Sequence, residues 1–145
     1  MRNFTYPVSL LPEDRGHFTV QFADIPEAIT SGKNPGEALV KAADCLDEAI
    51  AGRIAEGLEI PAPSKAKRGH LLVTLPGSMA AKASLYLTMR EQGVSRSELA
   101  RRLAIDEKEV RRMLDPLHAT KLPRIEQALA ALGCRLVVSL ELAAA

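Results

Sequence analysis

The residues with the clearest potential for chemistry lie in one short segment of the C-terminal half, SRSELARRLAIDEKEVRRML. Ser95 stands three residues before Glu98, which is the spacing of a capping box at the start of a helix. Asp106 and Glu109 repeat that spacing further along the segment. Two short helices joined by a tight turn are typical of a helix-turn-helix, whose second helix enters the major groove of DNA. The segment therefore predicts a DNA-binding surface.

The candidate DNA contacts are the polar residues that this arrangement leaves facing outward. The tight turn is expected at Ala104 and Ile105. Apolar residues of the two helices would meet inside, so the basic side chains of the second helix would be free to bind guanine edges or phosphates. The start of the first helix and the segment after the second would lie near the DNA backbone. The predicted DNA-binding residues are Ser95, Arg96, Ser97, Glu107, Lys108, Arg111, Arg112 and Lys121.

The charge distribution bears on this interpretation. Residues 77–145 hold 11 Lys and Arg against 8 Asp and Glu, whereas residues 1–76 hold 8 against 10. A helical hairpin whose charged residues only face solvent is the alternative, but the two capping boxes and the local basic excess favour DNA binding. Glu107 and Glu109 weaken attraction to phosphate and indicate either modest affinity or dependence on dimerisation, which doubles the contacts. Because helix-turn-helix proteins generally need twofold symmetry to span two half-sites, we expect a homodimer or higher even oligomer.

Other chemically active residue types form no pattern that predicts catalysis. The first expected strand lacks the carboxylates that a metal-dependent nuclease uses to hold Mg²⁺. Cys45 and Cys134 lie far apart without a CxxC motif. His17, His70 and His118 are scattered, with no nucleophile pattern nearby. We therefore expect no enzyme activity, no metal and no cofactor.

Length and composition set the outer bounds. The chain has 145 residues, of which 47% are hydrophobic, so it can form one ordinary domain or two small ones. Aromatic residues make up only 3% and Trp is absent, which argues against a stacking platform for single-stranded nucleic acid. No run of eighteen apolar residues occurs, so no membrane partner is expected and the predicted location is the cytoplasm.

The N-terminal half predicts a small sheet covered by one helix. Alternating apolar residues over 3–11 and 17–25 flank the turn sequence PEDRG and predict a β-hairpin. A short third strand over 28–31 and a strand over 70–75 complete a mixed or antiparallel sheet. Asn34 and Pro35 mark the start of a long helix that ends at Gly57. Residues 60–70 contain several prolines and predict a surface connector.

The C-terminal half predicts helices followed by a closing strand. One helix ends at Gly93, the helix-turn-helix follows, and a further helix ends at Gly133. Residues 135–142 alternate between apolar and polar and predict a terminal strand. Since the unpaired backbone groups of an edge strand readily pair with another strand, we expect this terminal strand to pair across the dimer. The break at LPGS places the domain boundary near Pro76, giving domains 1–76 and 77–145. The fold class is α+β.

The whole chain resembles HicB, the antitoxin of the HicAB type II toxin-antitoxin systems, in the form with a C-terminal helix-turn-helix domain. The most specific block is YPVSLLPEDRGHFTVQFADIPEAITSG. The helix GEALVKAADCLDEAI, the linker LEIPAPS, the segment SELARRLAIDEKEVRRMLDPLHATK and the stretch IEQALAALGCRL extend the resemblance to the C-terminal half. The family often has PDLPGC or PDIPG before its third strand, where this chain has ADIPEAI.

The resemblance implies both a fold and a function. The first domain would be a degenerate ribonuclease-H-like fold that sterically blocks a HicA toxin, a small mRNA interferase. The second domain would bind the promoter DNA of its own operon. Two other functions stay open. A ligand-responsive helix-turn-helix repressor without a toxin partner would need a lined pocket in the N-terminal half, and a nuclease would need clustered carboxylates.

Overall fold

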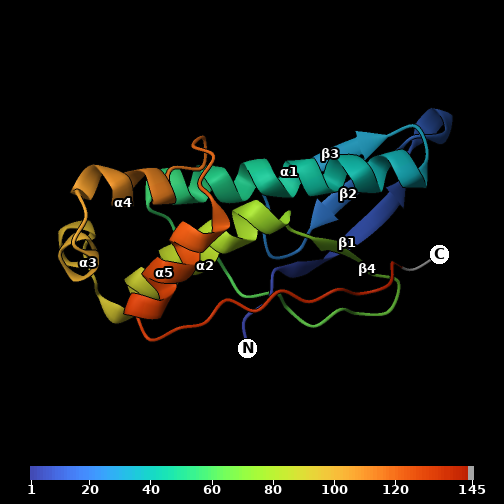
Figure 1. Ribbon diagram of the computed structural model, residues 1–145. Coiled ribbons are helices and arrows are strands. Elements are labelled where there is room, and N and C mark those ends of the chain that lie inside the picture. Colours follow the sequence, from blue (N-terminus) through green and yellow to red (C-terminus); the bar gives the residue numbers. More distant parts are fainter. Residues whose placement is uncertain (144–145) are drawn as a thin grey trace.

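The computed structural model describes residues 1–143. Strands and one long helix form the N-terminal half, and four shorter helices follow (Figure 1). The strands are β1 (Thr5–Pro12), β2 (Phe18–Phe22), β3 (Ile29–Gly32) and β4 (Leu71–Thr74), and a 3-10 turn, η1 (Asp14–Gly16), joins β1 to β2. The helices are α1 (Pro35–Glu56), α2 (Gly77–Gln92), α3 (Arg96–Leu103), α4 (Glu107–Leu114) and α5 (Leu122–Ala131).

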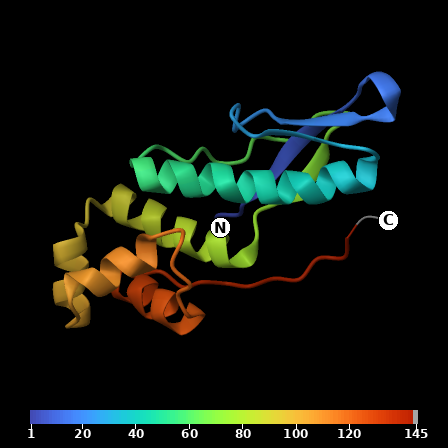
Figure 2. The ribbon, with the colours of Figure 1, turned by 90° about the horizontal axis from the view of Figure 1, so that it is seen from above.

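The four strands form one antiparallel sheet in the order β3-β2-β1-β4. In this register Val8 lies opposite Phe22 and Tyr6 lies opposite Val73. Helix α1 packs against β3 and β2, and Figure 2 shows it between the sheet and the shorter helices. The predicted α+β class, with a small sheet, one covering helix and a helical C-terminal half, is confirmed.

Helix α1 begins and ends where the sequence signals predict. The Asn34 side chain accepts a hydrogen bond of 2.8 Å from the Glu37 backbone N–H, and Pro35 occupies the first turn. Gly57 ends the helix with a φ of 71°, a left-handed conformation that glycine adopts without strain. The face turned to the sheet consists of residues at helical spacing. These are Ala38, Ala42, Leu46, Ile50 and Ile54.

Two apolar cores lie side by side, and α2 contributes to both. Met79, Ala83, Tyr86 and Leu87 belong to the first core, with the sheet and α1. Other buried residues of α2 belong to the second core, together with residues of α3, α4 and α5. Helix α2 therefore joins the two halves by packing. The division at residue 76 stays a prediction.

The segment between α1 and β4 is held against the first core. The Tyr6 hydroxyl donates a hydrogen bond of 2.8 Å to the carbonyl oxygen of Pro61. Burial, and to a smaller extent the nearby Asp24 carboxylate, raise the pKa of Tyr6 to about 12, so this hydroxyl keeps its proton. Asp24 also accepts hydrogen bonds from the backbone N–H and the hydroxyl of Ser64. The predicted connector thus has fixed anchor points.

The predicted terminal strand does not form, and residues 134–143 adopt neither helix nor strand. Cys134 and Leu136 still pack on the second core, whereas Val138 and Leu140 are 79% and 96% exposed. Figure 2 shows the tail leaving α5 as a separate trace. A strand needs a neighbour that supplies backbone hydrogen bonds, and the described part of the chain supplies none here. Pairing of this tail across a dimer stays a prediction.

Within residues 1–143, no helix has both the length and the apolar character needed to cross a membrane.

Candidate nucleic-acid interface

Helices α3 and α4 form the predicted pair with a tight turn. Ala104 ends α3 with a φ of 54°, and its backbone N–H bonds back to the carbonyl oxygen of Arg101. The Ile105 N–H reaches the carbonyl oxygen of Ala100 at 3.0 Å, which reverses the chain. Leu99 and Val110 are fully buried in the second core. The turn at Ala104 and Ile105 is therefore confirmed, and packing fixes the relative position of the two helices.

Both predicted N-cap residues cap their helices. The Ser95 hydroxyl oxygen accepts a hydrogen bond of 3.1 Å from the Glu98 N–H. The Asp106 carboxylate accepts one of 2.9 Å from the Lys108 N–H, one residue earlier than a capping box requires. These bonds satisfy backbone donors that a helix start leaves free. Each short helix therefore begins at a defined residue.

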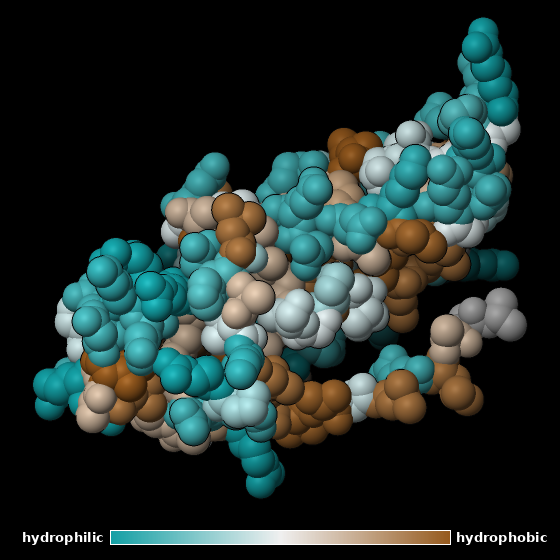
Figure 3. All heavy atoms as spheres, turned by 45° about the horizontal axis from the view of Figure 1, so that its top comes forward, coloured by the Kyte–Doolittle hydropathy of each residue, from teal (hydrophilic) through white to brown (hydrophobic). Residues whose placement is uncertain are grey.

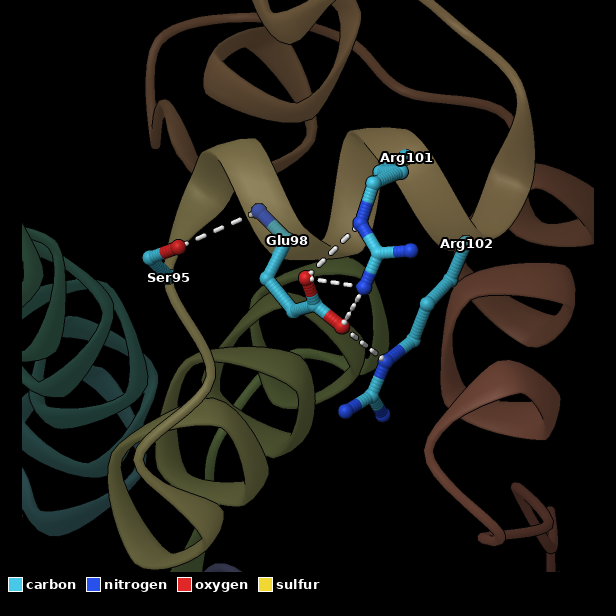
Figure 4. Close-up of polar contacts among 4 residues, drawn as sticks. All are labelled: Ser95, Glu98, Arg101 and Arg102. Atoms are coloured by element: carbon cyan, nitrogen blue, oxygen red, sulfur yellow. Dashed lines mark hydrogen bonds and ion pairs between the residues drawn. The ribbon is translucent and has the colours of Figure 1, made fainter.

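The return bonds of the two predicted capping boxes do not form. The Glu98 carboxylate instead accepts hydrogen bonds from the guanidinium groups of Arg101 and Arg102, as Figure 4 shows. Glu109 pairs with Arg124 at 2.8 Å. A guanidinium offers a carboxylate a full positive charge and several donors, whereas a backbone N–H offers one donor without net charge, so the carboxylates turn toward arginine. This part of the prediction was wrong because it left out the competing arginines, which lie three and four residues after Glu98 in α3 and fifteen residues after Glu109.

The ion pairs of Glu98 with Arg101 and Arg102 determine the electrostatics of α3. Hydrogen bonds from Arg101, then from Arg102, hold the pKa of Glu98 below its ordinary value. The same contact raises the pKa of Arg101. Both arginines also lie in the last turn of α3, where the helix end carries partial negative charge. Glu98 thus stays ionised and orients two cations at the end of the helix.

All eight predicted DNA-binding residues are exposed. Within residues 1–143, Arg96, Lys108, Arg111 and Lys121 form no ion pair, so their charges are available to a ligand. On the face seen in Figure 3, the end of the molecule built from α3 and α4 carries mostly hydrophilic side chains. The arrangement offers a rigid helix with free cations to a polyanion.

The eight residues fall into separate groups. A shallow hollow between the end of α2 and the starts of α3 and α4 brings four of them together. These are Ser95, Arg96, Ser97 and Glu107. Lys108, Arg111 and Arg112 lie along α4, and Lys121 precedes α5. Arg124, the neighbour of Lys121 in the sequence, is already engaged by Glu109.

The sequence analysis did not single out Lys82, a buried lysine on α2. Its amine donates hydrogen bonds to the carbonyl oxygens of Arg112, Met113 and Asp115, at 3.1, 3.0 and 2.9 Å. The signal that could have found it is its isolation, because Lys82 is the sole charged residue in GSMAAKASLYLT. A single charge in an apolar helical stretch indicates a specific buried partner.

Residues 1–143 contain no group of three or more His, Cys, Asp or Glu side chains placed to hold a metal ion. Asp44, Asp47 and Glu48 are neighbours on α1. Burial, followed by the charges of the other two, raises the pKa of Asp47. The two hollows described in the chain are open to solvent, and neither lies inside the sheet.

The comparisons with known proteins agree with the resemblance noted in the sequence. A family described as the HicB-like antitoxin of bacterial toxin-antitoxin systems matches residues 5–84. The chain is 40% identical over 132 residues to Antitoxin HicB 2 of Photorhabdus laumondii subsp. laumondii, covering 91% of this chain and 93% of that protein. It is 35% identical over 128 residues to Antitoxin HicB of Escherichia coli strain K12, covering 88% and 93%. It is 36% identical over 132 residues to Antitoxin HicB of Pseudomonas fluorescens strain Pf0-1, covering 90% of each.

Proposed function

The chain belongs to the HicB-like antitoxin family, and we propose that it neutralises a HicA-like mRNA interferase and represses its own operon. In this proposal, the sheet and α1 bind the toxin and block it sterically. Helices α3 and α4 bind operator DNA. The protein acts in the cytoplasm without a catalytic step, a metal or a cofactor.

The observation that carries the DNA-binding part is the outer face of α4. Val110 and Met113 are buried, whereas Lys108, Arg111 and Arg112 point away from the core and are exposed. In a helix-turn-helix, the corresponding helix lies in the major groove and its outward side chains meet base edges. Glu109, the acidic residue next to Lys108, is neutralised by Arg124. The ion pair turns the Glu109 carboxylate toward Arg124, while Lys108, Arg111 and Arg112 keep unpaired charges among the described residues.

The proposed assembly is a homodimer or a higher even oligomer. One helix-turn-helix reads one half-site, and a twofold protein reads two half-sites in register. The tail after Leu136 is the proposed contact between copies, because its apolar side chains Val138, Leu140 and Leu142 are exposed. Pairing two such tails would satisfy their free backbone groups and bury these side chains together.

The experiment that tests the toxin-binding part is co-expression with the small open reading frame adjacent to this gene. Affinity purification then asks whether the two proteins form a complex, and an RNA cleavage assay is run with and without the antitoxin. A complex that suppresses cleavage supports the proposal. If no complex forms but the protein binds the upstream promoter, it is a repressor without a toxin partner.

The DNA-binding part is tested separately by titrating the full chain into labelled DNA from upstream of its own operon. We expect binding that weakens steeply with salt, because Lys and Arg contacts to phosphate release counterions. Equal affinity for upstream DNA and for unrelated DNA of the same length would contradict operator recognition.

A further inference from the structure

Among the described residues, Lys82 is the sole charged side chain buried in the protein interior, at 4% exposure. Burying an ammonium group is costly unless all its donors find acceptors. Lys82 has four acceptors within reach: the three carbonyl oxygens of Arg112, Met113 and Asp115, and the Thr120 hydroxyl at 2.9 Å. No carboxylate pairs with it directly. The site is therefore built for a cation by neutral oxygens.

Two of these oxygens belong to the last turn of α4. Carbonyl groups at a helix end lack partners within the helix and carry partial negative charge. Helices α1 and α2 solve this problem with Gly57 and Gly93, both in the left-handed conformation. Helix α4 has no such glycine, because Asp115 follows in an extended conformation. The Asp115 backbone N–H reaches the carbonyl oxygen of Arg112 at 3.2 Å, and the Lys82 amine, supplied from α2, completes the C-terminal cap by binding the carbonyl oxygens of Arg112 and Met113.

The same amine also holds the loop that follows α4. The Thr120 hydroxyl accepts a bond from Lys82 and donates one of 3.3 Å to the carbonyl oxygen of Arg112. Thr120 directly precedes Lys121, one of the predicted DNA contacts. The positions of Arg112 and Lys121 are thus set by one buried group that itself cannot reach DNA.

We propose that Lys82 is a positioning residue for operator binding, which fixes the end of α4 and the loop 115–121 so that Arg112 and Lys121 meet the DNA together. This inference rests on the proposed DNA-binding function. Its physical basis is preorganisation, since a helix end and a loop that are already ordered lose less entropy when they bind.

A residue that only stabilises the fold would give a different result from a positioning residue. The slope of log Kd against log salt concentration reports the number of phosphates that the protein neutralises. A stabilising residue changes the folded fraction and leaves that slope unchanged. Loss of a positioned phosphate contact lowers the slope by about 1.

The test compares full-length Lys82→Met with the wild type on upstream operon DNA. Methionine keeps an unbranched apolar chain as far as Cε but lacks the amine and its donors. We expect operator affinity to fall by about tenfold, the loss of one charge-assisted contact, with the salt slope lower by about 1. Ile125→Val is the control, because it removes one methyl group from the second core and no polar contact. This control is expected to lower the melting temperature and to keep the wild-type salt slope.

Thr120→Val provides a second variant in case Lys82→Met does not fold. It removes one acceptor of the ammonium group and the bond to Arg112 while keeping the side-chain shape. We expect about a threefold loss of operator affinity. If the double variant Lys82→Met, Thr120→Val folds, its fold loss of operator affinity should be smaller than the product of the two single fold losses, because both substitutions remove the same contact.

The possible outcomes separate the positioning role of Lys82 from the proposed operator function. If the wild type binds upstream DNA and a folded Lys82→Met keeps the wild-type salt slope, with or without a loss of affinity, the positioning role is wrong. An unchanged Thr120→Val overturns it as well if Lys82→Met does not fold. If the wild type itself does not bind upstream DNA, the proposed operator function fails, and the positioning role fails with it.

Discussion

The Tyr86 hydroxyl on α2 donates a hydrogen bond of 2.7 Å to the carbonyl oxygen of Leu58, just after the end of α1. One turn further along α2, the Arg90 guanidinium lies 5.4 Å from the centre of the Tyr86 ring. Arg90 also donates a bond of 2.8 Å to the carbonyl oxygen of Gly57. The turn after α1 is therefore fixed to α2 by polar bonds as well as by packing.

Tyr86→Phe should lower the free energy of unfolding by about 1 kcal/mol, because it leaves the Leu58 carbonyl without this donor. Urea denaturation of the full chain measures the change. Tyr6→Phe is a parallel variant, since it removes the equivalent bond from β1 to Pro61. An unchanged unfolding midpoint for Tyr86→Phe would mean that water replaces the hydroxyl without loss.

Gly32→Ala should destabilise the N-terminal half by about 2 kcal/mol or more. A Cβ atom at Gly32 would lie 2.4 Å from the backbone nitrogen of Ala38, so β3 and the start of α1 would have to separate. Thermal unfolding measures the loss. The control is Gly52→Ala in the C-terminal part of α1, where a Cβ has no atom within 4 Å. That control should stabilise the protein by about 0.5–1 kcal/mol, and equal effects at the two sites would contradict the packing described.

Arg111→Ala and Arg112→Ala should each weaken operator binding by about 1–3 kcal/mol for each base-reading contact that is lost. Toxin binding should not change, because both residues lie on the outer face of α4. Fluorescence anisotropy with labelled upstream DNA measures the effect. Arg15→Ala removes the same charge from the turn between β1 and β2 and serves as the control. Unchanged operator affinity in both α4 variants would show that this helix does not read DNA.

A chain that ends at Leu136 should be monomeric if the tail joins the copies. This end point keeps Cys134 and Leu136 on the second core, so the fold should be preserved. Sedimentation equilibrium compares the shortened chain with the full chain. A shortened chain that stays dimeric would place the contact elsewhere.

The pKa of Glu98 should rise toward its ordinary value in Arg101→Ala, and further when Arg102→Ala is added, since these arginines hold it down. A depressed carboxyl pKa in the folded state contributes stability above the unfolded pKa, and this contribution is lost as pH falls through the folded pKa. The wild type should therefore lose this contribution under acidic conditions. Carbon-13 NMR titration of the carboxyl group follows it directly. A wild-type pKa equal to that of the double variant would contradict the ion pairs.

Local sequence signals were sufficient for the elements that local physics controls. Asn34 and Ser95 accept the predicted capping bonds, and alternating residues in β1 and β2 form the predicted hairpin. The features that were missed depend on distant partners. The terminal strand lacks a neighbour, and Glu109 pairs with an arginine fifteen residues away. The role of Lys82 depends on carbonyl groups about thirty residues further along, which no periodicity reveals.

The packing partners of α2 could not be predicted from the sequence for a different reason. The buried residues of α2 surround the helix on most sides. Such a pattern indicates burial but not which elements cover each side. The sequence therefore indicated two halves with a break at LPGS, whereas the packing of α2 joins them.

Because α2 has one face in each core, the C-terminal half is a poor unit for exchange by recombination. Transplanted alone, it would present Met79, Ala83, Tyr86 and Leu87 to water and would tend to aggregate. A productive chimaera would need to carry a matching α1 surface with it. If α4 reads operator DNA as proposed, a change of its specificity is therefore more accessible through point substitutions on the outside of α4 than through replacement of the whole C-terminal half.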